Sequence, residues 1–188
     1  MPMASDWVAD PQRENTIMIE HLRRRREDEE GFTLIELMVV VLIIAILVAI
    51  AVPTFMGARS RAQDRSAQST ARNALTSGRV LFTDNGDFGD PTRATVVTNL
   101  EAVDGAFDFV AGASTDQTEI SVMAFDGADA DTTADRIIYA VLSDSGECFY
   151  IEDDSGNGGS GATSYASQVA ASCDANSTAG LVWGSGGW

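Results

Sequence analysis

Hydrophobic and polar positions divide the chain into parts, and the most apolar part lies near the N-terminus. Residues 37–52 contain no polar side chain, and the largely apolar stretch extends back to Phe32 with one charged residue, Glu36. A bilayer core of about 30 Å needs roughly 20 apolar helical residues, so residues 32–52 predict a membrane-spanning helix. An acidic side chain in such a helix is costly and usually has a specific partner, which makes Glu36 the first candidate functional residue.

A second helical pattern follows Pro53. A proline inside a helix removes one backbone hydrogen bond and clashes with an earlier carbonyl group, so we expect a kink at Pro53; the alternative is that the helix ends there. Continuation is favoured because small and apolar residues recur at spacings of three and four, as in a helix with one packing face. The stop signal is Asp84–Asn85–Gly86, with Gly86 as a C-terminal cap. The recurring positions are Ala58, Ala62, Ala67, Ala71, Ala74, Leu75, Gly78, Leu81 and Phe82.

The rest of the chain predicts a globular part rich in β-structure. Alternating or apolar segments occur at 106–111, 119–126, 136–142 and 147–152. The turn signal Ser143–Asp144–Ser145–Gly146 separates the last two segments, so they are expected to form an antiparallel hairpin. Three or four strands packed on the second half of the helix would give an α+β fold of two layers.

Two features near the C-terminus leave alternatives open. Residues 153–161, with the sequence DDSGNGGSG, are typical of a flexible loop. Trp183 and Trp188 stand among glycines in the last segment. They either pack in the core or at a sheet edge, or form an exposed aromatic contact with an adhesion target or a neighbouring subunit.

The charge of the chain is strongly negative. The sequence has 28 Asp and Glu against 12 basic residues, all of them arginine, and its formal net charge is −16. This balance opposes non-specific binding of nucleic acid, so no specific nucleic-acid partner is expected. The cluster Arg23–Arg26 lies just before the apolar helix and favours a cytoplasmic N-terminus. Met1 and Met18 are both possible starts of this leader.

Residues 31–37, Gly-Phe-Thr-Leu-Ile-Glu-Leu, and the apolar run to Pro53 resemble the N-terminus of type IV pilins. The resemblance implies a long N-terminal helix packed on a small antiparallel β-sheet. It also implies cleavage between Gly31 and Phe32 by a prepilin peptidase, N-methylation of Phe32, and pairing of Glu36 with the terminal amine of a neighbouring subunit. Further implied partners are a pilus assembly platform, other pilins, and the membrane before assembly.

The domain boundaries follow from these patterns. They are a cytoplasmic leader over 1–31, a transmembrane and assembly helix over 32–53, an amphipathic helix over 54–86, and a globular head over 87–188. The head would lie outside the membrane, where disulfides form, so Cys148 and Cys173 are expected to pair. Type IV pilins, which the chain resembles at its N-terminus, often close a C-terminal loop in this way.

Metal binding and catalysis have weak support in the sequence. Asp126, Asp129, Asp131 and Asp135 form an acidic cluster that could hold calcium, but their spacing does not match an EF-hand, and a solvated acidic loop is the alternative. His21, the one histidine, lies in the leader, so no Ser–His or Cys–His pair is possible after cleavage. We expect no enzymatic activity and no cofactor.

The sequence is compatible with three functions. The first is a structural subunit of a type IV pilus, cleaved after Gly31 and polymerised for adhesion, motility or DNA uptake. The second is a pseudopilin of a type II secretion or competence machine. The third is a membrane-tethered binding module that does not polymerise. The first places the chain in the cell membrane with a cytoplasmic N-terminus and then in an extracellular filament.

Overall fold

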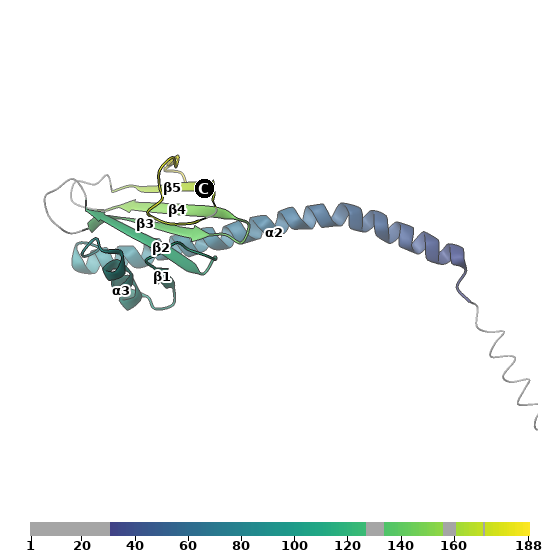
Figure 1. Ribbon diagram of the computed structural model, residues 1–188, viewed down its shortest axis with the longest axis horizontal. Coiled ribbons are helices and arrows are strands. Elements are labelled where there is room, and N and C mark those ends of the chain that lie inside the picture. The colour runs from purple at the N-terminus through teal and green to yellow at the C-terminus, as the bar shows by residue number, and fades with distance from the viewer. Residues whose placement is uncertain (1–30, 127–133, 156–160, 171) are drawn as a thin grey trace, which may run out of the picture. The chain divides into compact units, whose positions relative to one another are not determined.

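The computed structural model describes residues 31–126, 134–155, 161–170 and 172–188 (Figure 1). The chain divides into two compact units, with the boundary between Val52 and Pro53. The first unit contains the apolar half of a long helix. The second contains the other half, a shorter helix and a five-stranded sheet.

The long helix α2 runs from Leu34 to Asn85 and includes Pro53 in its interior. The expectation that helical structure continues past this proline is therefore confirmed. The helix ends where its stop signal predicted, because Gly86 adopts a φ of +85° and donates its N–H to the carbonyl oxygen of Phe82 at 2.7 Å. A glycine accepts this left-handed conformation without a steric penalty.

The sheet has the strand order β1-β2-β3-β4-β5. Its strands are β1 (Asp108–Val110), β2 (Glu119–Asp126), β3 (Ala134–Leu142), β4 (Glu147–Asp154) and β5 (Thr163–Val169). The β3–β4 hairpin is confirmed: Leu142 pairs with Cys148, and the turn is closed by a 2.8 Å hydrogen bond from Gly146 N to Ser143 O. Beyond β5, Tyr165 and Gly184 exchange two backbone hydrogen bonds of 2.8 and 2.9 Å.

The α+β fold agrees with the expectation, and three details of this part refine it or add to it. The sheet is mostly antiparallel rather than wholly so, because β1 pairs with β2 in parallel, and β1 is shorter than the segment 106–111. The helix α3 (Arg93–Val103) was not expected, since its valines and threonines have a low intrinsic helix propensity. Strand β5 was also not expected, because its sequence, TSYASQV, is largely polar.

The core of the second unit lies between the sheet and the two helices. The helical side of this core is formed by Ala67, Ala71, Ala74, Leu75 and Leu81 of α2, with Val96 and Leu100 of α3. These α2 positions belong to the face that the sequence predicted, but Ala58 and Ala62, which are expected on the same face, are exposed. The strands contribute alternate side chains to this core. They are Phe109, Ile120, Val122, Ala124, Ala134, Ile137, Tyr139, Val141, Phe149 and Ile151. The opposite face of the sheet carries a smaller cluster around Tyr150 and the two cysteines.

Candidate functional site

The start of α2 brings Thr33 and Glu36 into contact. A carboxylate oxygen of Glu36 accepts hydrogen bonds from the Thr33 N–H at 3.0 Å and from the Thr33 hydroxyl at 2.7 Å. The Glu36 N–H in turn donates to the Thr33 hydroxyl oxygen at 3.2 Å. This reciprocal pattern is a capping box, in which residues three apart satisfy backbone N–H groups that the helix leaves unpaired.

Thr33 was not singled out in the sequence, although the pattern Thr-x-x-Glu before an apolar run is a known helix-start signature. Its contact with Glu36 means that the carboxylate is hydrogen-bonded within this segment. The carboxylate has hydrogen-bond donors within its own chain, so it is not isolated in the single chain. Gly31 and Phe32 precede this box, and residue Phe32 is 82% exposed.

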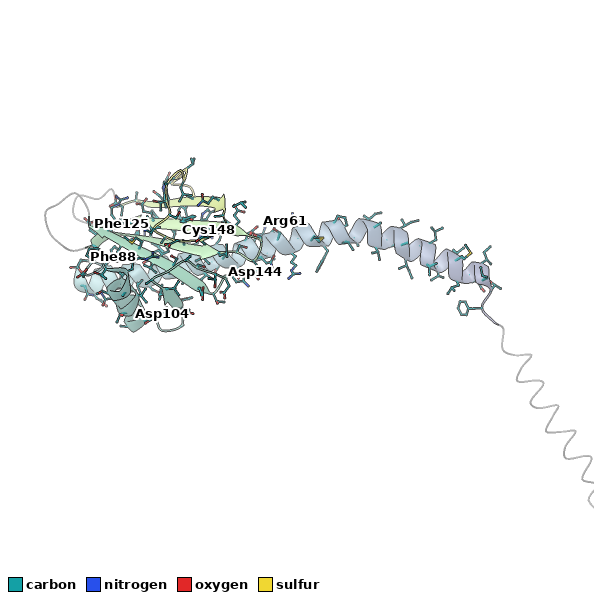
Figure 2. The ribbon with its side chains drawn as sticks, in the orientation of Figure 1. Arg61, Phe88, Asp104, Phe125, Asp144 and Cys148 are labelled. Atoms are coloured by element: carbon teal, nitrogen blue, oxygen red, sulfur yellow. A yellow bond between two sulfur atoms is a disulfide. The ribbon has the colours of Figure 1, made fainter. Side chains whose placement is uncertain are left out.

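The apolar half of α2 leaves its side chains uncovered. Between Leu34 and Val52 the large apolar residues are each about half exposed or more, and Figure 2 shows them projecting outward around the helix. The helix is long and apolar enough to cross a membrane, and none of its most apolar window is buried within the chain. A contiguous apolar surface of this extent is unfavourable in water and requires lipid or protein to cover it.

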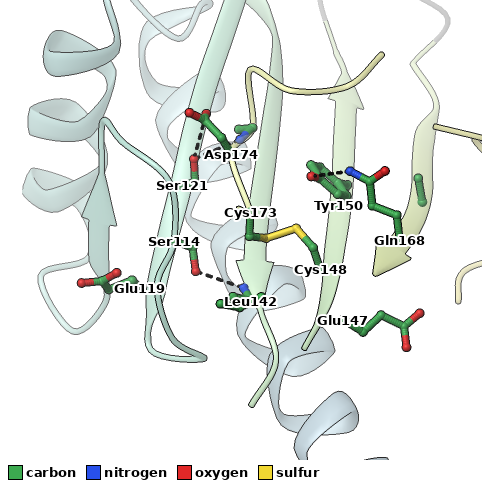
Figure 3. The surroundings of a disulfide bond; sticks show 12 residues. Ser114, Glu119, Ser121, Leu142, Glu147, Cys148, Tyr150, Gln168, Cys173 and Asp174 are labelled. Atoms are coloured by element: carbon green, nitrogen blue, oxygen red, sulfur yellow. Dashed lines mark hydrogen bonds between the residues drawn. A yellow bond between two sulfur atoms is a disulfide. The ribbon is translucent and has the colours of Figure 1, made fainter. Parts of the chain in front are cut away.

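The second unit contains the expected disulfide between Cys148 and Cys173, whose Cα atoms lie 5.5 Å apart (Figure 3). Cys148 belongs to β4, and Cys173 lies in the segment after β5. Backbone contacts add to this link, because Ser114 N donates to Cys173 O at 2.8 Å. The hydroxyl of Ser114 also accepts from Leu142 N at 3.0 Å, so the disulfide lies within a network that joins three parts of the head.

Arg93 holds the residue after Cys173 in place. Its guanidinium forms a 2.8 Å ion pair with Asp174 and donates to Val122 O at 2.9 Å and Gly112 O at 3.1 Å. Burial raises the pKa of Asp174, but the hydrogen bonds from Arg93 and from Asn176 N–H outweigh it, so the pKa lies below its ordinary value. The contact was not foreseen, since nothing local in the sequence links α3 to this segment.

Trp183 and Trp188 both pack against the sheet. The ring of Trp188 contacts Phe149 and Tyr165 edge to face, with centroids 5.5 and 5.0 Å away, and Arg72 lies 5.1 Å from its centroid. Its indole N–H donates to Ala166 O at 2.7 Å. Trp183 contacts Tyr150 at 6.5 Å on the other face. The packing interpretation is therefore the one that these contacts support.

The four acidic calcium candidates are only partly visible. Asp129 and Asp131 lie outside the described residues, and the side chain of Asp126 is not described either. Asp135 belongs to β3 and is 7% exposed, so it is not part of a solvated loop. Within residues 31–126, 134–155, 161–170 and 172–188, no group of three or more acidic, histidine or cysteine side chains could hold a metal ion.

Comparisons with known proteins define the class of the N-terminal segment. Residues 28–52 match the family model of the prokaryotic N-terminal methylation motif. The chain is 40% identical over 60 residues to the type IV major pilin protein PilA of Myxococcus xanthus. The matched segment is 32% of this chain and 27% of that protein. It is 32% identical over 73 residues to the type IV wide pilus major component PilA4 of Thermus thermophilus, covering 39% of this chain and 56% of that protein.

These matches confirm the resemblance to type IV prepilins: the chain carries their N-terminal methylation motif, and its relatives are type IV major pilins. The long apolar helix with a mostly antiparallel sheet is consistent with the type IV pilin fold. The chain spans about a quarter and about half of the length of these two relatives. No solved structure matches the chain.

Proposed function

We propose that this chain is the structural subunit of a type IV pilus. In this proposal it is made as a membrane-anchored precursor with a cytoplasmic leader over 1–31, cut between Gly31 and Phe32, N-methylated at Phe32 and polymerised into an extracellular filament. Its partners are other copies of itself, the prepilin peptidase, the assembly platform and other pilins. It serves as a structural protein and not as an enzyme.

The observation that carries this proposal is an uncovered apolar helix with one carboxylate, directly after a Gly–Phe junction. Lipid can cover the helix before assembly, and copies of the same helix can cover it afterwards. A single head-to-tail contact that does not close on itself generates a helical polymer. The match to the methylation motif and the similarity to type IV major pilins support this function over that of a non-polymerising membrane-tethered module.

Glu36 sets the axial position of each subunit in the proposed filament. Cleavage creates a positively charged amine on Phe32, and methylation of an amine preserves its charge. In a low-dielectric bundle, this ammonium group and a carboxylate attract strongly, and either would be costly alone. Before assembly, the Thr33 N–H and hydroxyl provide the hydrogen bonds of Glu36. The amine of a neighbouring Phe32 adds a positive charge opposite the Glu36 carboxylate, which the neutral donors of Thr33 do not supply.

The proposed kink at Pro53 would separate the part of α2 that enters the filament core from the part that packs on the sheet. The proline cannot donate a backbone hydrogen bond, which lowers the cost of bending α2 at this position. Membrane helices tolerate such positions because neighbouring groups satisfy the freed carbonyl oxygen.

The test compares Glu36→Ala with Glu36→Gln in cells. Glutamine preserves the side-chain length and a carbonyl oxygen for Thr33, but it has no charge. We expect both variants to be cleaved after Gly31 and both to lose surface filaments, as seen by electron microscopy and by the intact mass of sheared surface material. Filaments from Glu36→Gln at the normal level would show that capping, and not charge pairing, is the role of Glu36.

The same mass measurement tests the processing steps. Native sheared material should begin at Phe32, carry one additional methyl group and lack two hydrogens because of the disulfide. A chain that retains Arg23–Arg26 and stays in the membrane fraction would contradict the filament function. Processed chains that form only short periplasmic assemblies would assign the chain to a secretion or competence machine.

A further inference from the structure

The segment after the disulfide contains a modification motif. Asn176–Ser177–Thr178 is the one Asn-X-Ser/Thr triplet in the whole sequence, and its middle residue is not proline. This pattern is the acceptor signal for N-linked glycosylation, which occurs on surface loops of exported proteins. The triplet alone is a weak signal, so its value depends on where the fold places Asn176.

The fold places Asn176 on an exposed turn. The turn is closed by a 2.8 Å hydrogen bond from Ser177 N to Asp174 O, and Asp174 Oδ1 accepts the backbone N–H of Asn176 at 2.9 Å. Cys173 and Ala175, on the N-terminal side, are fully buried. Asn176 itself is exposed, and its side-chain amide makes no hydrogen bond within the described part of the chain. The amide nitrogen is therefore available to an enzyme.

The base of this turn is firmly attached to the sheet. Asp174 pairs with Arg93, Ala175 N donates to the Ser121 hydroxyl at 3.0 Å, and the preceding cysteine is joined to β4 (Figure 3). The acceptor residue thus keeps one position on the head. A group attached there would extend from the sheet face opposite to α2, because Cys173 and Ala175 belong to the cluster on that face.

The surface beside the triplet has room for sugars. A hollow of about 320 Å³ adjoins it, and Thr178, the third residue of the triplet, forms part of its wall. Trp183 and Phe125 supply aromatic surface there, and Arg136 and Glu152 supply charged hydrogen-bonding groups. The apolar faces of sugar rings pack on aromatic rings. The hydroxyl groups of sugars form hydrogen bonds with charged side chains, so the wall of this hollow suits a carbohydrate.

We propose that Asn176 carries an N-linked glycan whose first sugars lie over this hollow. The inference rests on the proposed function insofar as the head must be exported. The co-reactant is an oligosaccharide joined through its anomeric carbon to a lipid diphosphate. Asn176 Nδ2 forms a bond to that carbon, and the bond from the carbon to the phosphate oxygen breaks. The lipid diphosphate leaves with the electron pair, and one Nδ2 proton passes to a carboxylate of the transferring enzyme.

The experiment is mass spectrometry of the full chain purified from its native cells. Cleavage on the carboxyl side of Asp and Glu releases residues 175–188 as one peptide that carries the triplet. In native material, we expect this peptide to be heavier by a sum of whole monosaccharide residues. Asn176→Gln and Thr178→Ala should each abolish the increment completely. Ser177→Ala is the matched control, and Thr178→Ser preserves the hydroxyl; both should retain the increment.

Specific outcomes would overturn the proposal. An unmodified peptide from a chain that begins at Phe32 and contains the disulfide would rule out the glycan and leave the pilus function intact. An increment that persists in Asn176→Gln, or that mild alkaline β-elimination removes, would assign the sugar to a serine or threonine instead. A chain with its leader present and its cysteines reduced would contradict both the export and the glycan.

Discussion

The hydroxyl group of Tyr139 on β3 lies directly against Gly78 of α2. A Cβ atom added at Gly78 would overlap the hydroxyl oxygen and lie 3.0 Å from the Tyr139 Cζ. Tyr139 is fully buried, and its hydroxyl has no hydrogen-bond partner among the described residues. The absence of a side chain at Gly78 therefore decides how closely the helix approaches the sheet.

Replacing Gly78 with alanine should destabilise the head. Alanine gains about 1 kcal/mol over glycine in a helix interior. Overpacking a well-filled core costs typically about 1–3 kcal/mol, and the buried ring of Tyr139 has little freedom to move. We expect a net loss of about 1 kcal/mol in the free energy of unfolding, measured by denaturant titration with tryptophan fluorescence in detergent.

Gly57→Ala is the matched control for this prediction. A Cβ atom at Gly57 meets only the end of the Arg61 side chain, at 3.5 Å, so this variant should be neutral or more stable. Tyr139→Phe removes the overlapping hydroxyl and should restore stability in combination with Gly78→Ala. Equal stability of Gly78→Ala and Gly57→Ala would contradict the close approach.

Arg79 and Asp153 form the main polar contact between α2 and β4. The guanidinium donates to both carboxylate oxygens of Asp153, at 3.2 and 3.1 Å, and to the Thr163 hydroxyl at 2.6 Å. Asp153 is fully buried, whereas the Arg79 side chain is half exposed. Arg79→Met should cost about 2–4 kcal/mol of stability, because it leaves a buried carboxylate without its counter-charge.

Arg79→Lys separates charge from geometry at this contact. Lysine preserves the positive charge but cannot form the two-point hydrogen-bonded fork, so an intermediate loss is expected. The double variant Arg79→Met with Asp153→Asn should recover part of the stability, since no buried charge remains. A double variant less stable than Arg79→Met would show that the carboxylate has enough other donors, such as the hydroxyl of Ser155.

Stability should fall in acid partly because of Asp174. Its pKa lies below the ordinary value of 3.8, so the carboxylate stabilises the fold above pH 3.8 and this contribution is lost as the pH falls through the folded-state pKa. Hydrogen bonds from Thr92 and Thr118 lower the pKa of Asp90 and Asp116 in the same direction. We expect the unfolding midpoint of the native chain to decrease below about pH 4.

Asp174→Asn and Arg93→Gln isolate the contribution of this ion pair. Both variants should be less stable than the native chain at pH 7, by about 1–3 kcal/mol, because a charge-assisted hydrogen bond is removed. Asp174→Asn should also have a shallower decrease in acid, since one of the depressed carboxyl groups is absent. An unchanged acid profile in Asp174→Asn would assign the pH dependence to Asp90 and Asp116.

Removing the disulfide should cost about 3 kcal/mol in the chain-entropy account of a loop of this length. The double variant Cys148→Ser with Cys173→Ser is the suitable change, since it leaves no free thiol. A reducing agent should produce the same loss of stability in the native chain and no change in the double variant. If the native chain keeps its full stability after both cysteines have been reduced, the hydrogen-bond network around Ser114 is sufficient to hold this region.

Local signals explain what could be predicted from the sequence. The end of α2 at Gly86 and the β3–β4 hairpin depend on turn residues that act within a few positions. The capping box could also be predicted from the sequence, because Thr33 and Glu36 are three residues apart, as this motif requires; only Glu36 was singled out. The cysteine pairing followed from the number of cysteines and the expected compartment.

Tertiary packing explains what could not be predicted. Val96 and Leu100 hold α3 against β1 and β2 despite the low helix propensity of its threonines and valines. Strand β5 is polar, but its backbone pairs with β4 along its full length. The ion pair of Arg93 with Asp174 depends on how distant segments meet, and no local pattern in the sequence records that.

The bridge between Tyr165 and Gly184 has a consequence for the crowded polymer that we propose. The free edge of a sheet invites strand addition from another molecule, and neighbouring heads in a filament are present at very high local concentration. Here the C-terminal segment occupies hydrogen-bonding groups on the outer side of β5, and the opposite edge strand, β1, is only three residues long. Each head therefore offers little backbone for edge-to-edge aggregation, and in the proposed filament the apolar helix can make the contacts between subunits.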